Sequence, residues 1–339
     1  MSAGLFGLPA GFRLRELELL SILGGGKRSL VYKAYDHALN RHVAVKEFLP
    51  VDHVRRDLAH VEARQEQRES FERGLARFIS EARIMTRFNH PVLRGAFSLI
   101  QENGTAYIVM PYYDGTTLRE MTNNGFRAKN MEDIFSFLLP ILSGLSYLYN
   151  AGYGHYCISP DNILVREDGT PVLLDFGAVG ELGQSAEECL LTELIPGFAA
   201  PEQYGHGETC LGVWTDIYAF SAVAYHMVTG LAPPPAVSRI AHDALKPLAS
   251  LASPGLPSAL LEVFERGLAI EAKARPRDIV SFANALQEAA YRAISQSARP
   301  ESARILAADA AVSAFSPRIR RILQFAWNLR EKIHPGART

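Results

Sequence analysis

The chain has 339 residues, 48% of them hydrophobic, and a formal net charge of −1. This length suits a two-lobed globular domain with a tail, and the lack of a basic surplus argues against nucleic-acid binding. The three cysteines form no C-x-x-C pair, and their odd number argues against a disulfide framework. We see no signal peptide and no apolar run of membrane-spanning length, so we expect a cytoplasmic protein.

The first half of the chain predicts a β-rich region that carries one helix. Strand-like patterns flank a run of three glycines, Gly24 to Gly26, and the next strand ends at Lys46. Such a run is typical of a hairpin turn, but it also lets backbone amides approach a phosphate closely. A charged segment over roughly 52–69 precedes a helix whose apolar residues recur at helical spacing from Phe71 to Met85. Strands follow near 96–101 and 105–110.

The second half predicts mostly helices. We expect them at 116–122, 131–150, 257–267 and 279–293, and the second is apolar enough to form a core. Residues 155–162 form a loop between helix and strand, and short strands at 163–165 and 172–174 lead into Asp175. Residues 231–257 are rich in Pro, Ala and Ser and predict a surface excursion.

Read together, these segments resemble a protein kinase. Residues 155–162 read H-Y-C-I-S-P-D-N, similar to the catalytic loop H-R-D-x-K-P-x-N, and Asp175-Phe176-Gly177 matches the metal-binding D-F-G. Residues 46–50 and 196–204 resemble bacterial Hanks-type serine/threonine kinases. The resemblance implies an α+β, two-lobed fold: a leader at 1–12, a β-rich small lobe with one helix at 13–113, a mostly helical large lobe at 114–293, and a helical extension at 294–339.

The resemblance also implies a site for ATP and Mg²⁺. Lys46 would contact the α- and β-phosphates and pair with Glu81, while the Pro111 carbonyl and the Tyr113 N–H would bind adenine. Asn162 and Asp175 would be the metal ligands. The implied nucleotide-binding residues are Gly24, Gly26, Val31, Ala44, Lys46, Glu81, Met110, Pro111, Tyr113 and Leu164. Taken alone, Lys46 and Glu81 would be an ordinary strand-end lysine and a solvated carboxylate.

The catalytic loop departs from the family pattern in three places. Cys157 occupies the position of the catalytic Asp, and an unperturbed thiol, with a pKa of about 8.5, is mostly neutral and a weak acceptor. Ser159 replaces the Lys that steadies the transferring phosphate. Tyr156 replaces the Arg that receives a phosphorylated residue, so we expect no conventional switch through Ser185 or Thr192. A nucleophilic role for Cys157 is disfavoured, because no histidine pairs with it in a recognisable motif.

Scaffold residues of the family are retained. Glu202 and Arg275 match a buried ion pair, and Asp216 matches the aspartate that braces the catalytic loop. We therefore predict a pseudokinase that signals or scaffolds through a protein partner, with ATP and Mg²⁺ as candidate ligands. Two alternatives stay open: a weak or atypical kinase or AMP transferase, and an interaction module without nucleotide.

The tail contains one candidate helix. Residues 316–333 combine an apolar stripe with five basic residues, a pattern that fits docking on the protein's own large lobe, a protein partner or a membrane surface. We favour docking on the large lobe, because amphipathic helices usually pack internally.

Overall fold

The computed structural model describes residues 7–176, 179–185, 194–207 and 210–297. The chain divides into two compact units, Met1–Asp114 and Gly115–Thr339, one residue away from the lobe boundary predicted at 113/114. The candidate helix at 316–333, Gly177 and Thr192 lie outside the described residues.

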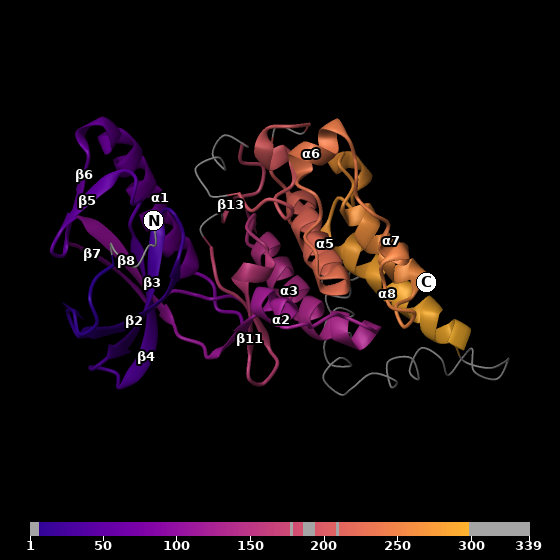
Figure 1. Cartoon of the computed structure of the whole chain (residues 1–339), viewed down its shortest axis with the longest axis horizontal. Helices are drawn as coiled ribbons and strands as arrows, with labels where there is room; N and C mark the ends of the chain where they lie inside the picture. Colours follow the sequence, from indigo (N-terminus) through magenta and orange to yellow (C-terminus); the bar gives the residue numbers. More distant parts are fainter. Residues whose placement is uncertain (1–6, 177–178, 186–193, 208–209, 298–339) are drawn as a thin grey trace. The chain divides into compact units, whose positions relative to one another are not determined.

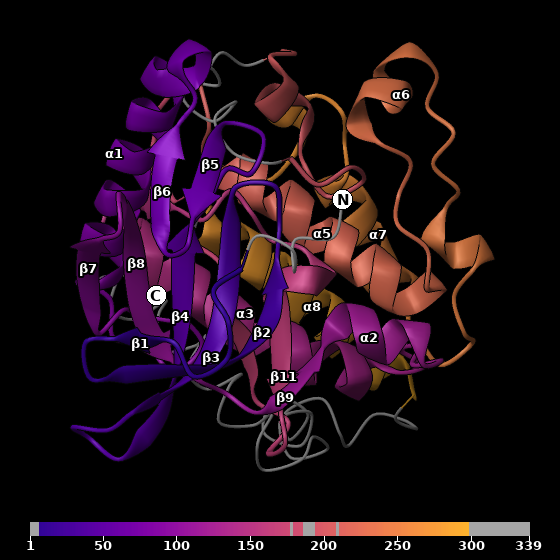
Figure 2. The same cartoon turned by 60° about the vertical axis from the view of Figure 1, so that its left-hand side comes forward.

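Unit 1 contains a six-stranded antiparallel sheet (Figures 1 and 2). Its strand order is β1 (Arg13–Leu14), β2 (Leu17–Gly25), β3 (Ser29–Asp36), β4 (Arg41–Phe48), β8 (Thr105–Pro111) and β7 (Ser98–Glu102). Burial alternates residue by residue along β3, because successive side chains of a strand point to opposite faces. The predicted pair of strands at 96–101 and 105–110 is confirmed as β7 and β8.

One face of this sheet is covered by α1 (Arg68–Met85). The apolar stripe predicted there faces the sheet: the Phe48 ring lies 5.4 Å from that of Phe71 and 5.5 Å from that of Phe78. Gly74 makes this approach possible, since a Cβ at Gly74 would lie 2.8 Å from the Phe48 ring. The helix begins three residues before the predicted stripe.

The sequence analysis missed a second, small sheet in unit 1. Strands β5 (Val54–Asp57) and β6 (His60–Ala63) form an antiparallel hairpin where only a charged segment was predicted. Val54 and Val61 are buried, but each strand is only four residues long, too short for its alternation to stand out among the charges.

Unit 2 is mostly helical. Its helices are α2 (Leu118–Asn123), α3 (Met131–Asn150), α5 (Val213–Thr229), α6 (Ala236–Ala241), α7 (Ser258–Gly267) and α8 (Ile279–Ser297). A three-stranded sheet, β12 (Pro171–Leu173), β11 (Ile163–Arg166) and β9 (Gly115–Thr117), and a short pair, β10 (Tyr153–Gly154) and β13 (Gly180–Glu181), flank the catalytic loop. Within the predicted excursion at 231–257, α6 anchors Arg239, whose buried guanidinium contacts Asp243, Tyr218 and the Leu268 carbonyl.

Helix α3 forms the centre of unit 2 and packs against α5 and α8. By length and composition it could cross a membrane, so the expectation that no segment reaches spanning length was too strict. However, 61% of its most apolar window is buried inside the protein, which fits a core helix.

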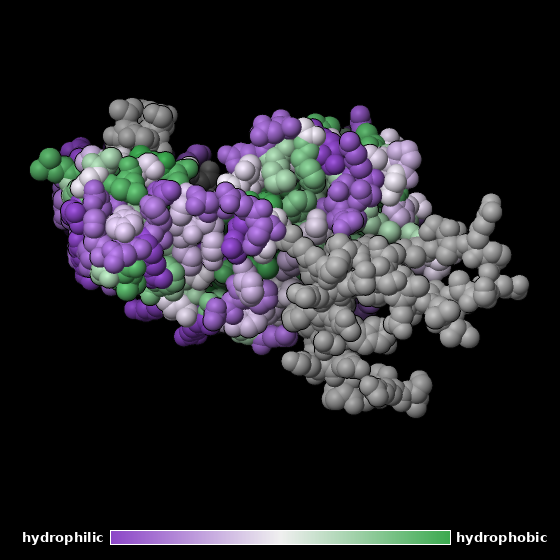
Figure 3. Space-filling view, turned by 90° about the horizontal axis from the view of Figure 1, so that it is seen from below, coloured by the Kyte–Doolittle hydropathy of each residue, from purple (hydrophilic) through white to green (hydrophobic). Residues whose placement is uncertain are grey.

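Hydrophilic side chains predominate among the described residues on the face shown in Figure 3.

Candidate functional site

Lys46 and Glu81 form a buried ion pair in unit 1. Lys46 lies on β4 and Glu81 on α1, and the Lys46 Nζ donates to Glu81 Oε1 over 2.9 Å. Both residues are less than 10% exposed. Glu81 is therefore not the solvated carboxylate that it would be in isolation, and it directs the ammonium group of Lys46 toward the α1 side of the sheet.

Three other predicted residues share the sheet face of Lys46. Val31 lies directly opposite Lys46, and Ala44 lies opposite Met110. Cross-strand partners point to the same face, as do residues two apart on one strand. The register thus places Val31, Ala44, Lys46 and Met110 on one surface, although they are separated by up to 79 positions in the chain.

The glycine run forms the predicted hairpin turn between β2 and β3. Gly24 pairs with Val31, Gly25 pairs with Leu30, and the Gly26 N–H donates to the Ser29 carbonyl over 3.0 Å. The turn requires a glycine at position 25, because a Cβ there would lie 2.7 Å from the Ser29 carbonyl oxygen. The sequence analysis singled out Gly24 and Gly26 instead.

The predicted adenine-binding residues lie in both units. Pro111 ends β8, and its carbonyl accepts an N–H from Arg94 Nε over 3.1 Å, a partner that the sequence analysis did not identify. Tyr113 follows at the end of unit 1. Leu164 is a buried residue of β11, the middle strand of the three-stranded sheet in unit 2.

In unit 2, Asp216 braces the catalytic loop as predicted. Its carboxylate accepts the backbone N–H groups of His155 and Tyr156, each over 2.7 Å, and the Tyr149 hydroxyl over 2.9 Å. Burial raises the pKa of Asp216 to about 6, although these three hydrogen bonds act in the opposite direction. Tyr156 has a φ of 57°, a left-handed conformation that is strained for a residue with a Cβ, and Asp216 holds the backbone there.

Cys157 is held by Asn162. The Asn162 Nδ2 donates to the Cys157 carbonyl over 2.9 Å and approaches the Cys157 sulfur at 3.2 Å. The neighbouring His155 is fully buried, and burial lowers its pKa to about 4, so its ring is neutral at pH 7. An uncharged imidazole does not stabilise a thiolate, and this supports the expectation that Cys157 is not a nucleophile.

Asn162 and Asp175 fit a metal that is also held by phosphate oxygens. Asn162 uses its amide nitrogen for Cys157, which leaves its amide oxygen available, and its carbonyl accepts the N–H of Leu174, the residue before Asp175. Among the described residues there is no group of three His, Cys, Asp or Glu side chains that could hold a metal alone. One amide oxygen and one carboxylate suit Mg²⁺, which usually takes its remaining ligands from water and substrate phosphates.

Ser159 and Tyr156 fill the positions of two family cations with uncharged side chains. Ser159 is fully buried, and its hydroxyl has no hydrogen-bond partner within the described structure. The Tyr156 ring is buried with Leu211 and covers Gly154, where a Cβ would lie 2.3 Å from the ring. The Tyr156 hydroxyl contacts the Glu181 carbonyl at 3.5 Å. An uncharged aromatic ring packed against Leu211 therefore stands where the family has an arginine.

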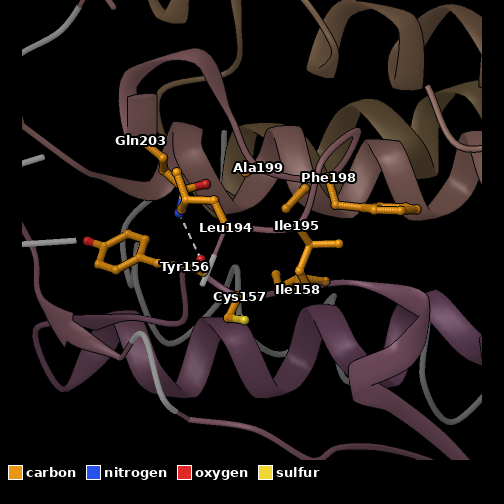
Figure 4. A pocket seen from close by; sticks show the side chains of 9 residues that line it. Tyr156, Cys157, Ile158, Leu194, Ile195, Phe198, Ala199 and Gln203 are labelled. Carbon is orange, nitrogen blue, oxygen red and sulfur yellow. Dashed lines mark hydrogen bonds between the residues drawn. The ribbon is translucent and has the colours of Figure 1, made fainter. Parts of the chain in front are cut away.

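Gln203 is a functional residue that the sequence analysis missed. Its Nε2 donates to the Tyr156 carbonyl over 2.9 Å, and its Oε1 accepts the Ala200 N–H over 3.0 Å. Gln203 thus ties residues 196–204 to the catalytic loop (Figure 4). Its position next to Glu202, which the family pattern had already singled out, was the available signal.

A small, partly open pocket lies at this junction. In Figure 4 the Tyr156 and Phe198 rings lie at opposite ends of the labelled group. The pocket is lined by Tyr156, Cys157, Ile158, Leu194, Ile195, Phe198, Ala199, Gln203 and Ala219. The neighbouring Glu202 forms the predicted buried ion pair with Arg275, at 2.8 and 3.1 Å.

A two-layered β-rich unit with a Lys–Glu pair, followed by a helical unit with this loop, defines a protein kinase fold. The protein kinase domain family matches residues 17–253, and the chain belongs to this family. A solved structure described as "PpkA-294 apo form" is similar with a TM-score of 0.72 and 35% identity, over 83% of this chain and 99% of that one.

Similar curated sequences include probable bacterial serine/threonine-protein kinases. The chain is 33% identical over 219 residues to a probable serine/threonine-protein kinase of Streptomyces coelicolor, covering 62% of this chain and 30% of that protein. It is 32% identical over 268 residues to probable serine/threonine-protein kinase PknB of Bifidobacterium longum, covering 74% and 36%. The chain thus spans about a third of the length of these relatives.

Proposed function

We propose that this protein is a pseudokinase: a kinase-family module that binds ATP with Mg²⁺, transfers phosphate poorly and acts through a protein partner in the cytoplasm. The observation that carries the proposal is the contact between Asn162 and Cys157. The asparagine holds the loop backbone as the family pattern requires, but the side chain that it steadies is a thiol where the family has a carboxylate.

The nucleotide-binding part of the proposal rests on both units. Unit 1 supplies the Lys46–Glu81 pair and an apolar surface that includes Val31 and Ala44. Unit 2 supplies two oxygen donors, Asn162 and Asp175. When bound, Mg²⁺ would neutralise phosphate charge, and the role of this chain's residues would be to hold and orient the metal–nucleotide complex.

The loss of phosphoryl transfer rests on charge at two positions. A general base typically contributes a factor of ~10²–10⁴, or about 3–5 kcal/mol of activation free energy. Cys157 offers a thiol there in place of a carboxylate, and Ser159 offers a neutral hydroxyl in place of a cation. Tyr156 adds a third difference, since a tyrosine lacks the guanidinium that would pair bidentately with a phosphorylated residue.

A weak or atypical kinase, or a transferase that moves AMP, is the second candidate. The intact Lys46–Glu81 pair favours it, because positioning and electrostatics supply most of the catalysis in phosphoryl transfer. The same pair counts against a module that binds no nucleotide. For the segment 316–333 we keep docking on the protein's own large lobe as the proposal, ahead of membrane attachment.

Thermal shift of the full chain with millimolar ATP, with and without Mg²⁺, tests nucleotide binding. We expect a rise in melting temperature that grows with Mg²⁺ and is lost in Lys46→Met but kept in Lys246→Met, a change at an exposed lysine. No stabilisation of the wild type would support the nucleotide-free module instead. Transfer of label from γ- and α-labelled ATP then separates a pseudokinase from a kinase and from an AMP transferase.

A further inference from the structure

The residue after Lys46 is a buried carboxylate on the opposite face of the sheet. Glu47 is fully buried, and it accepts a hydrogen bond of 2.7 Å from the Tyr32 hydroxyl. Because adjacent residues of a strand point to opposite faces, the direction of the Glu47 side chain fixes the rotation of β4 about its axis. The same rotation sets the direction in which Lys46 points.

The charge of Glu47 is balanced from the β5–β6 hairpin. Arg56 Nη2 lies 2.7 Å from Glu47 Oε1, and the two side chains are 7% and 0% exposed. The N–H is not well aligned with the oxygen, so this contact is an ion pair rather than a directed hydrogen bond. Arg56 Nη1 also contacts the Ala59 carbonyl at 3.3 Å, which holds the guanidinium within the hairpin.

The hairpin is anchored to the sheet on either side of this pair. The Val61 N–H donates to the Asn103 carbonyl over 2.8 Å, and Asn103 Nδ2 donates to the Tyr107 hydroxyl over 3.2 Å. Tyr107 lies directly opposite Glu47 in the sheet register. Burial, followed by the charge of Glu47, raises the pKa of both Tyr32 and Tyr107, so both phenols remain hydrogen-bond donors.

The segment between β4 and the hairpin also contacts the glycine turn. The Leu49 N–H donates to the Arg28 carbonyl over 2.8 Å, and the Val51 N–H donates to the Lys27 carbonyl over 3.3 Å. One continuous stretch, from Lys46 to Arg56, therefore carries the phosphate-binding lysine, the support of the glycine turn and the cation that balances Glu47.

We propose that Arg56, Glu47 and Tyr32 form a positioning network for Lys46. The role of the β5–β6 hairpin is to bring Arg56, the cation of this network, to Glu47. The side chains of this network lie on the face of the sheet away from Glu81, whereas Lys46, Val31 and Ala44 point to the Glu81 face. It acts by holding β4 so that Lys46 stays paired with Glu81. The part of this inference that concerns ATP rests on the proposed function.

The first test needs no nucleotide. Acylation of the full-length protein with acetic anhydride, followed by mass spectrometry, measures the accessibility of Lys46 relative to the exposed Lys246. We expect Arg56→Met to raise Lys46 labelling several-fold and Arg56→Lys, which keeps the charge, to restore most of the protection. The control Arg73→Met removes an exposed ion pair on α1 and leaves labelling unchanged. If Lys46 in Arg56→Met is labelled to the same extent as Lys46 in the wild type, the proposal is overturned.

The second test compares ATP with adenosine, since Lys46 is assigned to the phosphates alone. We expect Arg56→Met to weaken ATP binding about tenfold and adenosine binding less than twofold. Equal loss for both ligands would indicate a merely structural role and would overturn the inference. No ATP binding by the wild type would instead overturn the proposed function, and the labelling result would still decide on the network. If Arg56→Met fails to fold, Glu47→Gln/Arg56→Met removes both charges together and takes its place.

Discussion

The side-chain amide of Asn162 lies between the carbonyl oxygen and the sulfur of Cys157, at 2.9 and 3.2 Å. The first contact fixes the backbone of the loop and does not depend on the side chain at position 157. The second places an N–H donor where the side chain ends. A carboxylate at position 157 would therefore find its backbone already in place and a donor ready to orient it.

From this geometry we expect Cys157→Asp to gain phosphoryl transfer. A general base contributes at most a factor of ~10²–10⁴ to the rate of phosphoryl transfer. Because Ser159 stands in place of a cation, we expect a smaller gain in this rate, of at least about tenfold. Label transfer from γ-labelled ATP measures it, and Ser159→Lys in the same chain should raise it further. Cys157→Asn, similar in size but unable to take a proton, is the matched control. Equal rates for the Asp and Asn variants would contradict the prediction.

Tyr156 should tolerate loss of its hydroxyl but not replacement by a cation. Its hydroxyl lies 3.5 Å from the Glu181 carbonyl, a long contact for a hydrogen bond, so Tyr156→Phe should lower the free energy of unfolding by about 1 kcal/mol or less. Tyr156→Arg should cost about 2 kcal/mol or more, because a charged guanidinium would replace an aromatic ring that is buried against Leu211. Urea unfolding of both variants measures the difference, and an Arg variant as stable as the Phe variant would show that the region is polar.

Sequence motifs predicted a β-rich unit followed by a helical one, and they predicted several of the contacts that the structure shows. The family resemblance implied the pairing of Lys46 with Glu81, of Asp216 with the loop and of Glu202 with Arg275, and the structure brings each pair together. The β5–β6 hairpin could not be predicted, because a charged residue such as Arg56 is expected at the surface. Its burial depends on an ion pair with Glu47, which lies on another strand. Local patterns carry no information on such pairs.

The same limit applies to Arg94 and Gln203. Each donates to a backbone carbonyl, Pro111 and Tyr156 respectively, and a carbonyl leaves no mark in the residue type that carries it. The role of Arg94 becomes visible only when the chain is folded, and the sequence marks Gln203 only by its position next to Glu202.

Breaking the ion pair between Glu202 and Arg275 should strongly destabilise unit 2. Both side chains are at most 1% exposed, and Arg275 also donates to the carbonyls of Trp214, Ala269 and Ile270. Arg275→Met leaves a buried carboxylate without its cation, which typically costs about 3–5 kcal/mol. Arg275→Lys should recover only part of this, since an ammonium cannot reproduce the bidentate contact. Urea unfolding measures both, and a loss below about 1 kcal/mol for Arg275→Met would contradict the assignment.

The stability of unit 2 should rise with pH between about 4 and 6, and His226 should account for much of the slope. Burial, followed by the charge of Arg119, lowers the pKa of His226 from 6.5 to about 4, and burial lowers that of His155 to about 4. Each histidine is protonated in the unfolded chain but neutral in the folded one within this window, so its contribution is lost as pH falls. Asp216 acts in the opposite direction, because its pKa is raised from 3.8 to about 6 and its contribution is lost as pH rises.

Between pH 4 and 6 the unfolded chain therefore binds about one proton more than the folded chain from these three groups, two from the histidines less one from Asp216. One proton corresponds to a slope of about 1.4 kcal/mol per pH unit, with stability higher at the higher pH. His226→Gln removes one titrating group and should bring this contribution to the slope close to zero. Thr122→Val is the matched control: it removes the hydroxyl that lies 2.7 Å from the His226 ring, which shifts the level of stability but leaves the titrating group in place. Urea unfolding at pH 4.5, 5.2 and 6 gives the slopes, and an unchanged slope in His226→Gln would show that this histidine is already charged in the folded protein.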